Sequence, residues 1–115
     1  MGQQVRVESG TDGIRIIACT GEFEYGALGP LRTAAEAAAA DPEVRRIVLD
    51  VRGVTFADSS MLALMLFMLR TGRLVLAGPL PPQLDRRLSL TMMRDLFTVT
   101  DGSTAVRALR AVGGS

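Results

Sequence analysis

The sequence has no histidine, lysine, asparagine or tryptophan, and all 13 of its basic residues are arginine. A Ser–His–Asp triad, a Cys–His nucleophile and a histidine-ligated metal site all need the missing imidazole. A phosphate loop of the Walker type needs the missing lysine. We therefore expect a protein that is not an enzyme and that holds no metal ion or cofactor.

Cysteine is nearly absent too. The one thiol, that of Cys19, lies in the apolar run GIRIIACTG, which is typical of a buried strand. A single cysteine excludes a disulfide within the chain. We interpret Cys19 as a small core residue of a reduced, cytoplasmic protein.

Long apolar runs are also missing. The longest, over residues 61–69, has nine residues and is followed by Arg70, whereas a membrane-spanning helix needs about 20. No N-terminal stretch combines a basic region, an apolar centre and a cleavage site for secretion. The sequence predicts a soluble protein without a membrane span.

The charges are balanced, with 13 basic and 12 acidic residues and a formal net charge of +1. This balance lacks the excess of positive charge that is typical of nucleic-acid-binding proteins, so we expect no direct nucleic-acid partner. A chain of 115 residues is long enough for a single domain with an ordinary hydrophobic core.

The first half of the sequence has the pattern of a hairpin followed by a helix. Residues 4–8 alternate between polar and apolar, the segment SGTDG is typical of a turn, and residues 14–20 form a second apolar run. A helix is predicted from Pro30 to Asp41, and its run of alanines at 37–40 favours close packing against a neighbour.

The second half alternates apolar strands with helices. Residues 44–51 form a nearly continuous apolar stretch, which predicts a parallel strand buried on both faces. The remaining predicted elements are, in order, a helix over 59–71, a strand over 73–78, a helix over 82–94, a strand over 96–100, and a last helix after 101–103 that buries Val106, Leu109 and Val112.

This order of elements predicts the fold class. We expect one α/β domain over residues 1–112, with a mixed sheet of four to five strands, an N-terminal antiparallel hairpin, about four helices and right-handed crossovers. Residues 113–115 are predicted to be a disordered tail.

The segment IVLDVRGVTFADSS, residues 47–60, carries most of the functional information. It contains a strand, a turn at a glycine, a short apolar run and then Asp58, Ser59 and Ser60 at the start of a helix. The first turn of a helix has unpaired N–H groups and the positive end of the helix dipole, which favour a negative charge. From the residues alone, a serine here is either a cap or a phosphate acceptor.

Three motifs in this order resemble the STAS domain, and within it the stand-alone anti-sigma factor antagonists of bacteria. TGEFE is similar to the family's pattern of glycine, glutamate, hydrophobic and acidic residue after the second strand, with Glu24 where aspartate is usual. IVLDVRGVTFADSS resembles the central strand and the Asp-Ser-Ser signature, and the segment from LVLAGPL onward follows the family's C-terminal half.

The resemblance implies a regulatory phosphorylation. In antagonists of this kind, the serine directly after the aspartate is phosphorylated by a serine/threonine kinase that is also the anti-sigma factor, and that serine is Ser59 here. The unphosphorylated form would bind the kinase and free a sigma factor, and a serine phosphatase would reset the switch. A phosphate adds charge that a helix start tolerates but a fitted partner surface does not. Asp58 is interpreted as a cap or an orienter of the hydroxyl, and Ser60 as a second capping hydroxyl.

The sequence departs from the family pattern at Met61, because the family usually has glycine after the serine pair. A methionine predicts a bulkier helix start, whereas glycine would let the backbone of a kinase approach the hydroxyl closely.

The helix over 61–69 is apolar all round, which leaves its orientation open. If Leu62, Met65, Leu66 and Leu69 face the sheet, then the opposite side of the helix carries Leu64, Phe67 and Met68. Either another helix of the chain covers these three residues, or they form a contact surface for a partner or for a second copy of the chain in a homodimer.

Two loops are predicted to form the partner surface at the edge where parallel strands end. They are the helix start, with Asp58, Ser59, Ser60 and Met61, and the segment 21–26, with Glu22 and Glu24. A competing hypothesis is a scaffold or transporter-accessory STAS module that is never phosphorylated. A nucleotide-binding function has little support without a glycine-rich phosphate loop.

Overall fold

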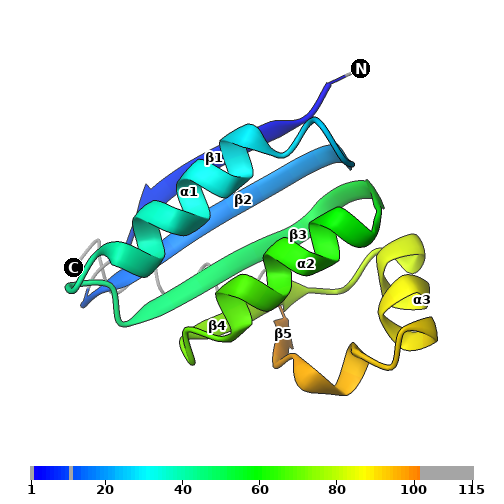
Figure 1. The fold of residues 1–115 in the computed structure, drawn as a ribbon. Coiled ribbons are helices and arrows are strands. Elements are labelled where there is room, and N and C mark those ends of the chain that lie inside the picture. Colours follow the sequence, from blue (N-terminus) through cyan, green and yellow to red (C-terminus); the bar gives the residue numbers. More distant parts are fainter. Residues whose placement is uncertain (1, 11, 102–115) are drawn as a thin grey trace.

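The computed structural model describes residues 2–10 and 12–101. Its elements are β1 (Gln4–Ser9), β2 (Ile14–Phe23), α1 (Gly29–Ala40), β3 (Arg46–Ala57), α2 (Ser59–Leu69), β4 (Leu74–Gly78), α3 (Pro82–Leu90), the short 3-10 helix η1 (Arg94–Leu96) and β5 (Val99–Asp101) (Figure 1). The described part thus has three α-helices, fewer than the four or so that were predicted. The predicted last helix and the predicted tail lie outside the described residues.

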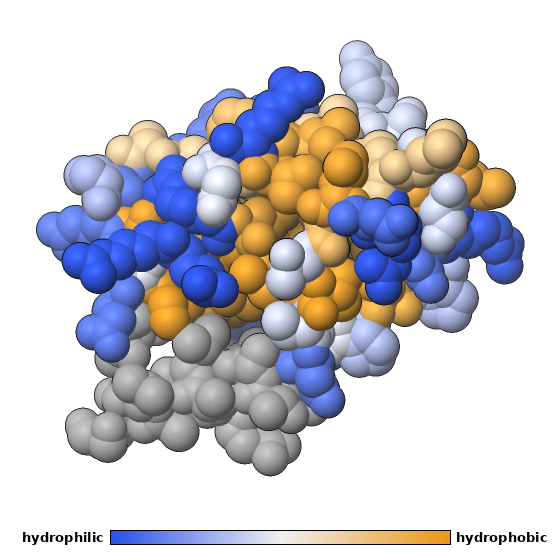
Figure 2. All heavy atoms as spheres, turned by 90° about the horizontal axis from the view of Figure 1, so that it is seen from below, coloured by the Kyte–Doolittle hydropathy of each residue, from blue (hydrophilic) through white to orange (hydrophobic). Residues whose placement is uncertain are grey.

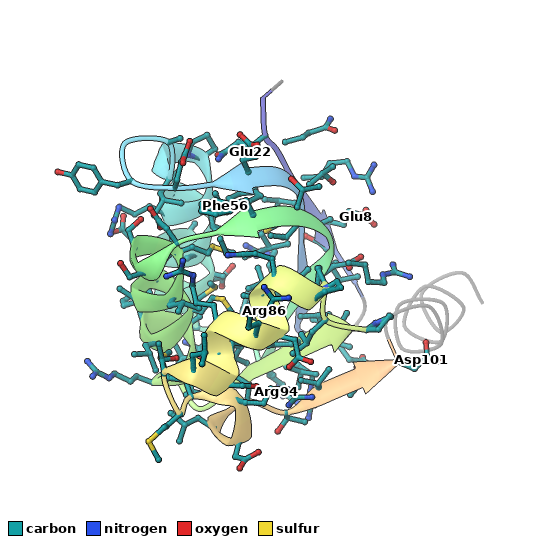
Figure 3. The ribbon with its side chains drawn as sticks, turned by 90° about the vertical axis from the view of Figure 1, so that its right-hand side faces the viewer. Glu8, Glu22, Phe56, Arg86, Arg94 and Asp101 are labelled. Atoms are coloured by element: carbon teal, nitrogen blue, oxygen red, sulfur yellow. The ribbon has the colours of Figure 1, made fainter. Side chains whose placement is uncertain are left out.

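The five strands form one mixed sheet in chain order. β1 pairs antiparallel with β2, and every later pair is parallel, which confirms the predicted N-terminal hairpin and mixed sheet. Each parallel strand is added on the far side of the one before it, so right-handed crossovers bring their helices to the same face. Figures 1 and 3 show α1 and α2 together on that face of the sheet.

Strand β3 is longer than predicted and does not turn at Gly53. Its register with β2 shifts twice, and at each shift β3 contains one extra residue, which is the pattern of a β-bulge. A Cβ atom on Gly53 would lie 3.0 Å from Thr20 Oγ1 and 3.1 Å from the Cys19 carbonyl oxygen. Glycine at position 53 therefore allows β2 and β3 to approach closely, and β3 continues without a turn to its end at Ala57.

The main core lies between the sheet and its helices. Its fully buried members include Ile17, Ile47, Leu49 and Leu76 from strands, and Leu31, Ala35, Ala38, Met65, Leu84 and Leu88 from helices. A second, smaller cluster lies on the other face of the sheet and contains Ile16, Val48 and Ala77. The alanine-rich helix packs against the core through Ala34, Ala35 and Ala38, so the predicted close packing holds for only one buried residue of the run 37–40.

Cys19 is a core residue, as predicted. Its side chain is 2% exposed, and burial, together with the negative charge of Asp50, raises the pKa of its thiol to about 12. A thiol with such a pKa stays protonated and unreactive at neutral pH.

The sequence left open whether another helix covers Leu64, Phe67 and Met68 or whether they contact a partner. The first alternative holds for Leu64 and Met68, so their prediction as partner contacts was wrong. Leu64 is 3% exposed and Met68 is fully buried, whereas Phe67 is 41% exposed. Helix α1 packs beside α2, so α2 is covered along its flank as well as beneath. Leu64 and Met68 therefore belong to the core and cannot contact a partner.

The outer surface of α2 is a narrow stripe. Ser59, Ala63, Phe67 and Arg70 are exposed along it, at the three- and four-residue spacing of one helix face.

Figure 2 shows the domain from below, where hydrophobic residues gather in the middle of the face between hydrophilic side chains. Within residues 2–101, no helix combines the length and apolar character needed to cross a membrane.

The alanines of α1 provide a test of the packing. Ala38 is fully buried against the core, whereas Ala37 is exposed on the same helix. We expect Ala38→Leu to overpack the core and to lower the free energy of unfolding by about 1–3 kcal/mol, as measured by urea denaturation. The matched change Ala37→Leu should alter it by less than about 0.5 kcal/mol, and equal effects of the two changes would contradict the packing.

Candidate functional site

The site lies where β2 and β3 end side by side. The backbone N–H of Asp58 donates to the carbonyl of Phe23 at 3.2 Å, which joins the residue before α2 to the last residue of β2. Loops that follow neighbouring parallel strands meet at this edge of a sheet, the usual place for binding sites in α/β folds. The predicted helix start and the loop after β2 are therefore brought together.

Asp58 is the N-cap of α2. Its Oδ1 accepts hydrogen bonds from the backbone N–H of Ser60 at 2.9 Å and of Met61 at 3.2 Å, and from the Ser60 hydroxyl. Its Oδ2 accepts from the backbone N–H of Tyr25 at 2.9 Å. One carboxylate thus satisfies two free donors of the helix and also fixes the loop after β2.

These contacts determine the charge state of Asp58. Burial is the largest single influence on the pKa of Asp58 and acts to raise it. The hydrogen bonds from the Ser60 hydroxyl and from the backbone N–H groups of Tyr25, Met61 and Ser60 together outweigh burial, so the pKa lies below its ordinary value. Asp58 is a carboxylate at neutral pH.

The two serines have different surroundings. Ser60 is partly buried, and its hydroxyl donates to Asp58. Ser59 is exposed, and its hydroxyl makes no hydrogen bond within the described part of the chain. The capping function that the sequence left open between these residues belongs to Asp58, so the hydroxyl of Ser59 points to solvent without a structural partner.

The expectation that Met61 enlarges the helix start was wrong. Its side chain is fully buried in the core beneath α2, because a residue two positions after Ser59 lies about 200° around the helix. The surface at Ser59 is therefore free of the methionine side chain. Met61 contributes its backbone N–H to the cap and no side-chain surface for a partner.

The two predicted glutamates lie in different places. Glu24 is exposed in the loop directly before Tyr25, and its carbonyl accepts from Ala27 N–H at 2.9 Å. Glu22 precedes the buried Phe23 in β2, so its side chain points to the face of the sheet away from the helices. Figure 3 shows Glu22 near Phe56, its register partner on β3, at the upper end of the sheet. Only Glu24 lies in the loop that Asp58 holds.

The structure adds Gln83 and Arg32, which sequence reasoning missed, and it identifies Tyr25 within the predicted segment 21–26. Gln83 of α3 binds the end of β3 through both side-chain atoms: Oε1 accepts from Ala57 N–H at 2.9 Å and Nε2 donates to the Ala57 carbonyl at 3.0 Å. Tyr25 and Arg32 line a groove beside the start of α2. No local pattern points to these contacts, because they join segments that are distant in sequence.

The groove has a volume of about 390 Å³ and lies between the loop after β2, the start of α1 and the first turns of α2. Its lining consists of Tyr25, Gly26, Leu28, Gly29, Arg32, Ser60 and Ala63. No group of three histidine, cysteine or acidic side chains in the described ranges is arranged to hold a metal ion.

An α/β domain with this strand order, and with an Asp-Ser-Ser helix start at the carboxyl edge of its parallel strands, has the architecture of a STAS domain. The family model described as "Mlab, STAS domain" matches residues 9–100. The chain therefore belongs to the STAS domain family. No match was found among the curated proteins.

Solved structures of anti-sigma factor antagonists share the fold. The unphosphorylated form of the antagonist SpoIIAA superposes with a TM-score of 0.74 at 21% identity, covering 94% of this chain and 97% of its own. The Bacillus protein in its phosphorylated form gives 0.71 at 21% identity, covering 93% and 100%. An anti-sigma factor antagonist from Mycobacterium paratuberculosis gives 0.72 at 26% identity, covering 95% of both chains.

The lowered pKa of Asp58 gives a pH-dependent test. Its carboxylate stabilises the fold above the unfolded pKa of about 3.9, and this stabilisation is lost as the pH falls through the folded pKa. Asp58→Asn should therefore be less stable than the wild type at pH 7, because an amide has one acceptor oxygen where the carboxylate uses two, and the gap in unfolding free energy should narrow below pH 4. Urea denaturation across pH 3 to 7 measures the gap. A gap that stays constant over this range would contradict the assigned contacts.

Proposed function

We propose that the chain is an anti-sigma factor antagonist that binds an anti-sigma serine kinase while Ser59 is unphosphorylated, and thereby releases a sigma factor. The observation that carries this proposal is the state of Ser59: its hydroxyl is exposed at the helix start, whereas the neighbouring Asp58 and Ser60 are bound to each other. In this view the protein is a cytoplasmic regulator, and the chemistry is performed by its partner.

The phosphorylation step transfers the γ-phosphoryl group of ATP to Ser59 Oγ. The hydroxyl proton passes to a base of the kinase, and ADP leaves. The fold offers little resistance to the product, because the side chain points to solvent and the positive end of the α2 dipole lies nearby.

The same phosphate would oppose partner binding. It adds a charge of about −1.5 to −2 at a surface that a partner must cover, next to the carboxylate of Asp58. Burying this charge without a matching cation in the partner costs free energy, so binding is lost while the domain stays folded. The likeness to SpoIIAA in both unphosphorylated and phosphorylated forms supports such a two-state switch.

The proposal is tested with the serine kinase encoded nearest to this chain in its genome. After incubation with ATP, mass spectrometry should detect one added phosphate on Ser59, and Ser59→Ala should prevent it while Ser60→Ala does not. Phosphate on Ser60 instead, or no phosphate together with no binding, would contradict the proposal.

Binding measurements separate this function from a constitutive STAS scaffold. Ser59→Asp should weaken binding of the kinase by about 1–3 kcal/mol relative to Ser59→Ala, through like-charge and desolvation costs. Isothermal titration calorimetry measures the difference. If both variants bind alike, the transporter-accessory or scaffold function fits better.

The buried Met61 generates a further prediction. Met61→Ala removes a fully buried side chain and should lower the free energy of unfolding by about 2–5 kcal/mol. The rate of Ser59 phosphorylation by the kinase should stay unchanged, measured at a temperature where the variant is folded. A large increase in the rate would show that the methionine does restrict access to Ser59.

A further inference from the structure

The groove beside α2 contains a cation without a counter-ion. Arg32 is exposed on the first turn of α1 and is the only charged residue in the lining. Within residues 2–10 and 12–101 its side chain forms no ion pair or hydrogen bond. The carboxylate of Asp58, which holds the loop at this groove, is already bound by Ser60, Met61 and Tyr25.

The rest of the lining leaves room for another side chain. Gly26, Gly29 and Ala63 have little or no side chain, and Leu28 is buried beneath them as an apolar floor. Tyr25, the only tyrosine of the chain, lies at the rim of the groove and is 87% exposed. Tyrosine and arginine are the residue types that contribute most often to binding hot spots.

The groove is continuous with the phosphorylation site. Ser60 belongs to its lining and directly follows Ser59, and Ala63 lies one helical turn after Ser59 on the exposed stripe of α2. A partner that covers Ser59 therefore also covers this groove.

We infer that the groove receives a segment of the anti-sigma factor kinase that carries an acidic side chain beside an apolar one. The acid pairs with Arg32, and the apolar side chain occupies the space over Leu28 and Ala63 against the Tyr25 ring. This inference rests on the function proposed above and names the chemistry of the partner segment. The charge pair supplies orientation and specificity, because a partner without the acid leaves the guanidinium covered and unpaired.

The first test compares charge reversals at two exposed arginines. Arg32→Glu should weaken binding of the kinase by about tenfold or more, and Ala63→Leu, which fills the groove without changing charge, should weaken it as well. Arg46→Glu makes the same change in net charge at the other end of β3 and should bind like the wild type. Circular dichroism verifies that each variant is folded.

The second test identifies the partner segment. Ala27→Cys adds a thiol at an exposed position between Gly26 and Leu28, beside the groove but outside its lining. The chain's own Cys19 is buried, so a photo-crosslinker can be attached at this position alone without filling the groove. The cross-linked kinase peptide should contain aspartate or glutamate next to an apolar residue. A peptide without an acid, or a cross-link to a second copy of this chain, would overturn the inference.

The outcomes separate the two proposals. If the wild type is phosphorylated on Ser59 and binds the kinase, but Arg32→Glu and Ala63→Leu bind equally well, the inference fails and the proposed function stands. If the wild type neither binds the kinase nor is phosphorylated by it, the proposed function fails, and the inference fails with it.

Discussion

The carboxylate of Asp58 is the contact on which the site depends. It caps α2 through the N–H groups of Ser60 and Met61, and it holds the loop after β2 through the N–H of Tyr25, 33 residues away. An N-cap of this kind contributes about 1 kcal/mol, but its larger effect is positional. It accepts a hydrogen bond from the hydroxyl of Ser60 and leaves that of Ser59 exposed. Two adjacent serines are thereby placed in different surroundings. The same carboxylate also fixes the loop after β2 beside the start of α2, and these two segments line the groove.

The sheet brings these parts to one edge. Because β2, β3, β4 and β5 follow one another in a single direction, right-handed crossovers carry their helices over one face and deliver the loops after β2 and β3 as neighbours. The two extra residues of β3 extend that strand to Ala57, where Gln83 of α3 binds the backbone on both sides. β2, through the carbonyl of Phe23, and α3, through the contacts of Gln83 with Ala57, thus hold the backbone at Asp58.

Much of the fold follows from local patterns in the sequence. The hairpin, the parallel central strand and the alanine-rich helix all have a clear periodicity, and the structure contains each of them. The surroundings of α2 were not predictable in this way, because a helix that is apolar all round has no polar face to orient it. Whether Leu64 and Met68 are covered or exposed depends on the packing of α1 beside α2. The turn expected at Gly53 is a strand with bulges, since glycine serves there for close approach to β2. The contacts of Tyr25 and Gln83, and the place of Arg32 in the groove, depend on tertiary structure, and the sequence carries no local signal for them.

The central claim is that the free hydroxyl of Ser59 controls whether the partner binds. Its most direct test is to purify the chain from cells together with whatever protein it holds, to separate the bound from the free chain, and to measure the intact mass of each fraction. The account predicts that the bound fraction carries no phosphate, whereas the free fraction contains chains with one phosphate on Ser59. An equal share of phosphorylated Ser59 in both fractions would contradict it.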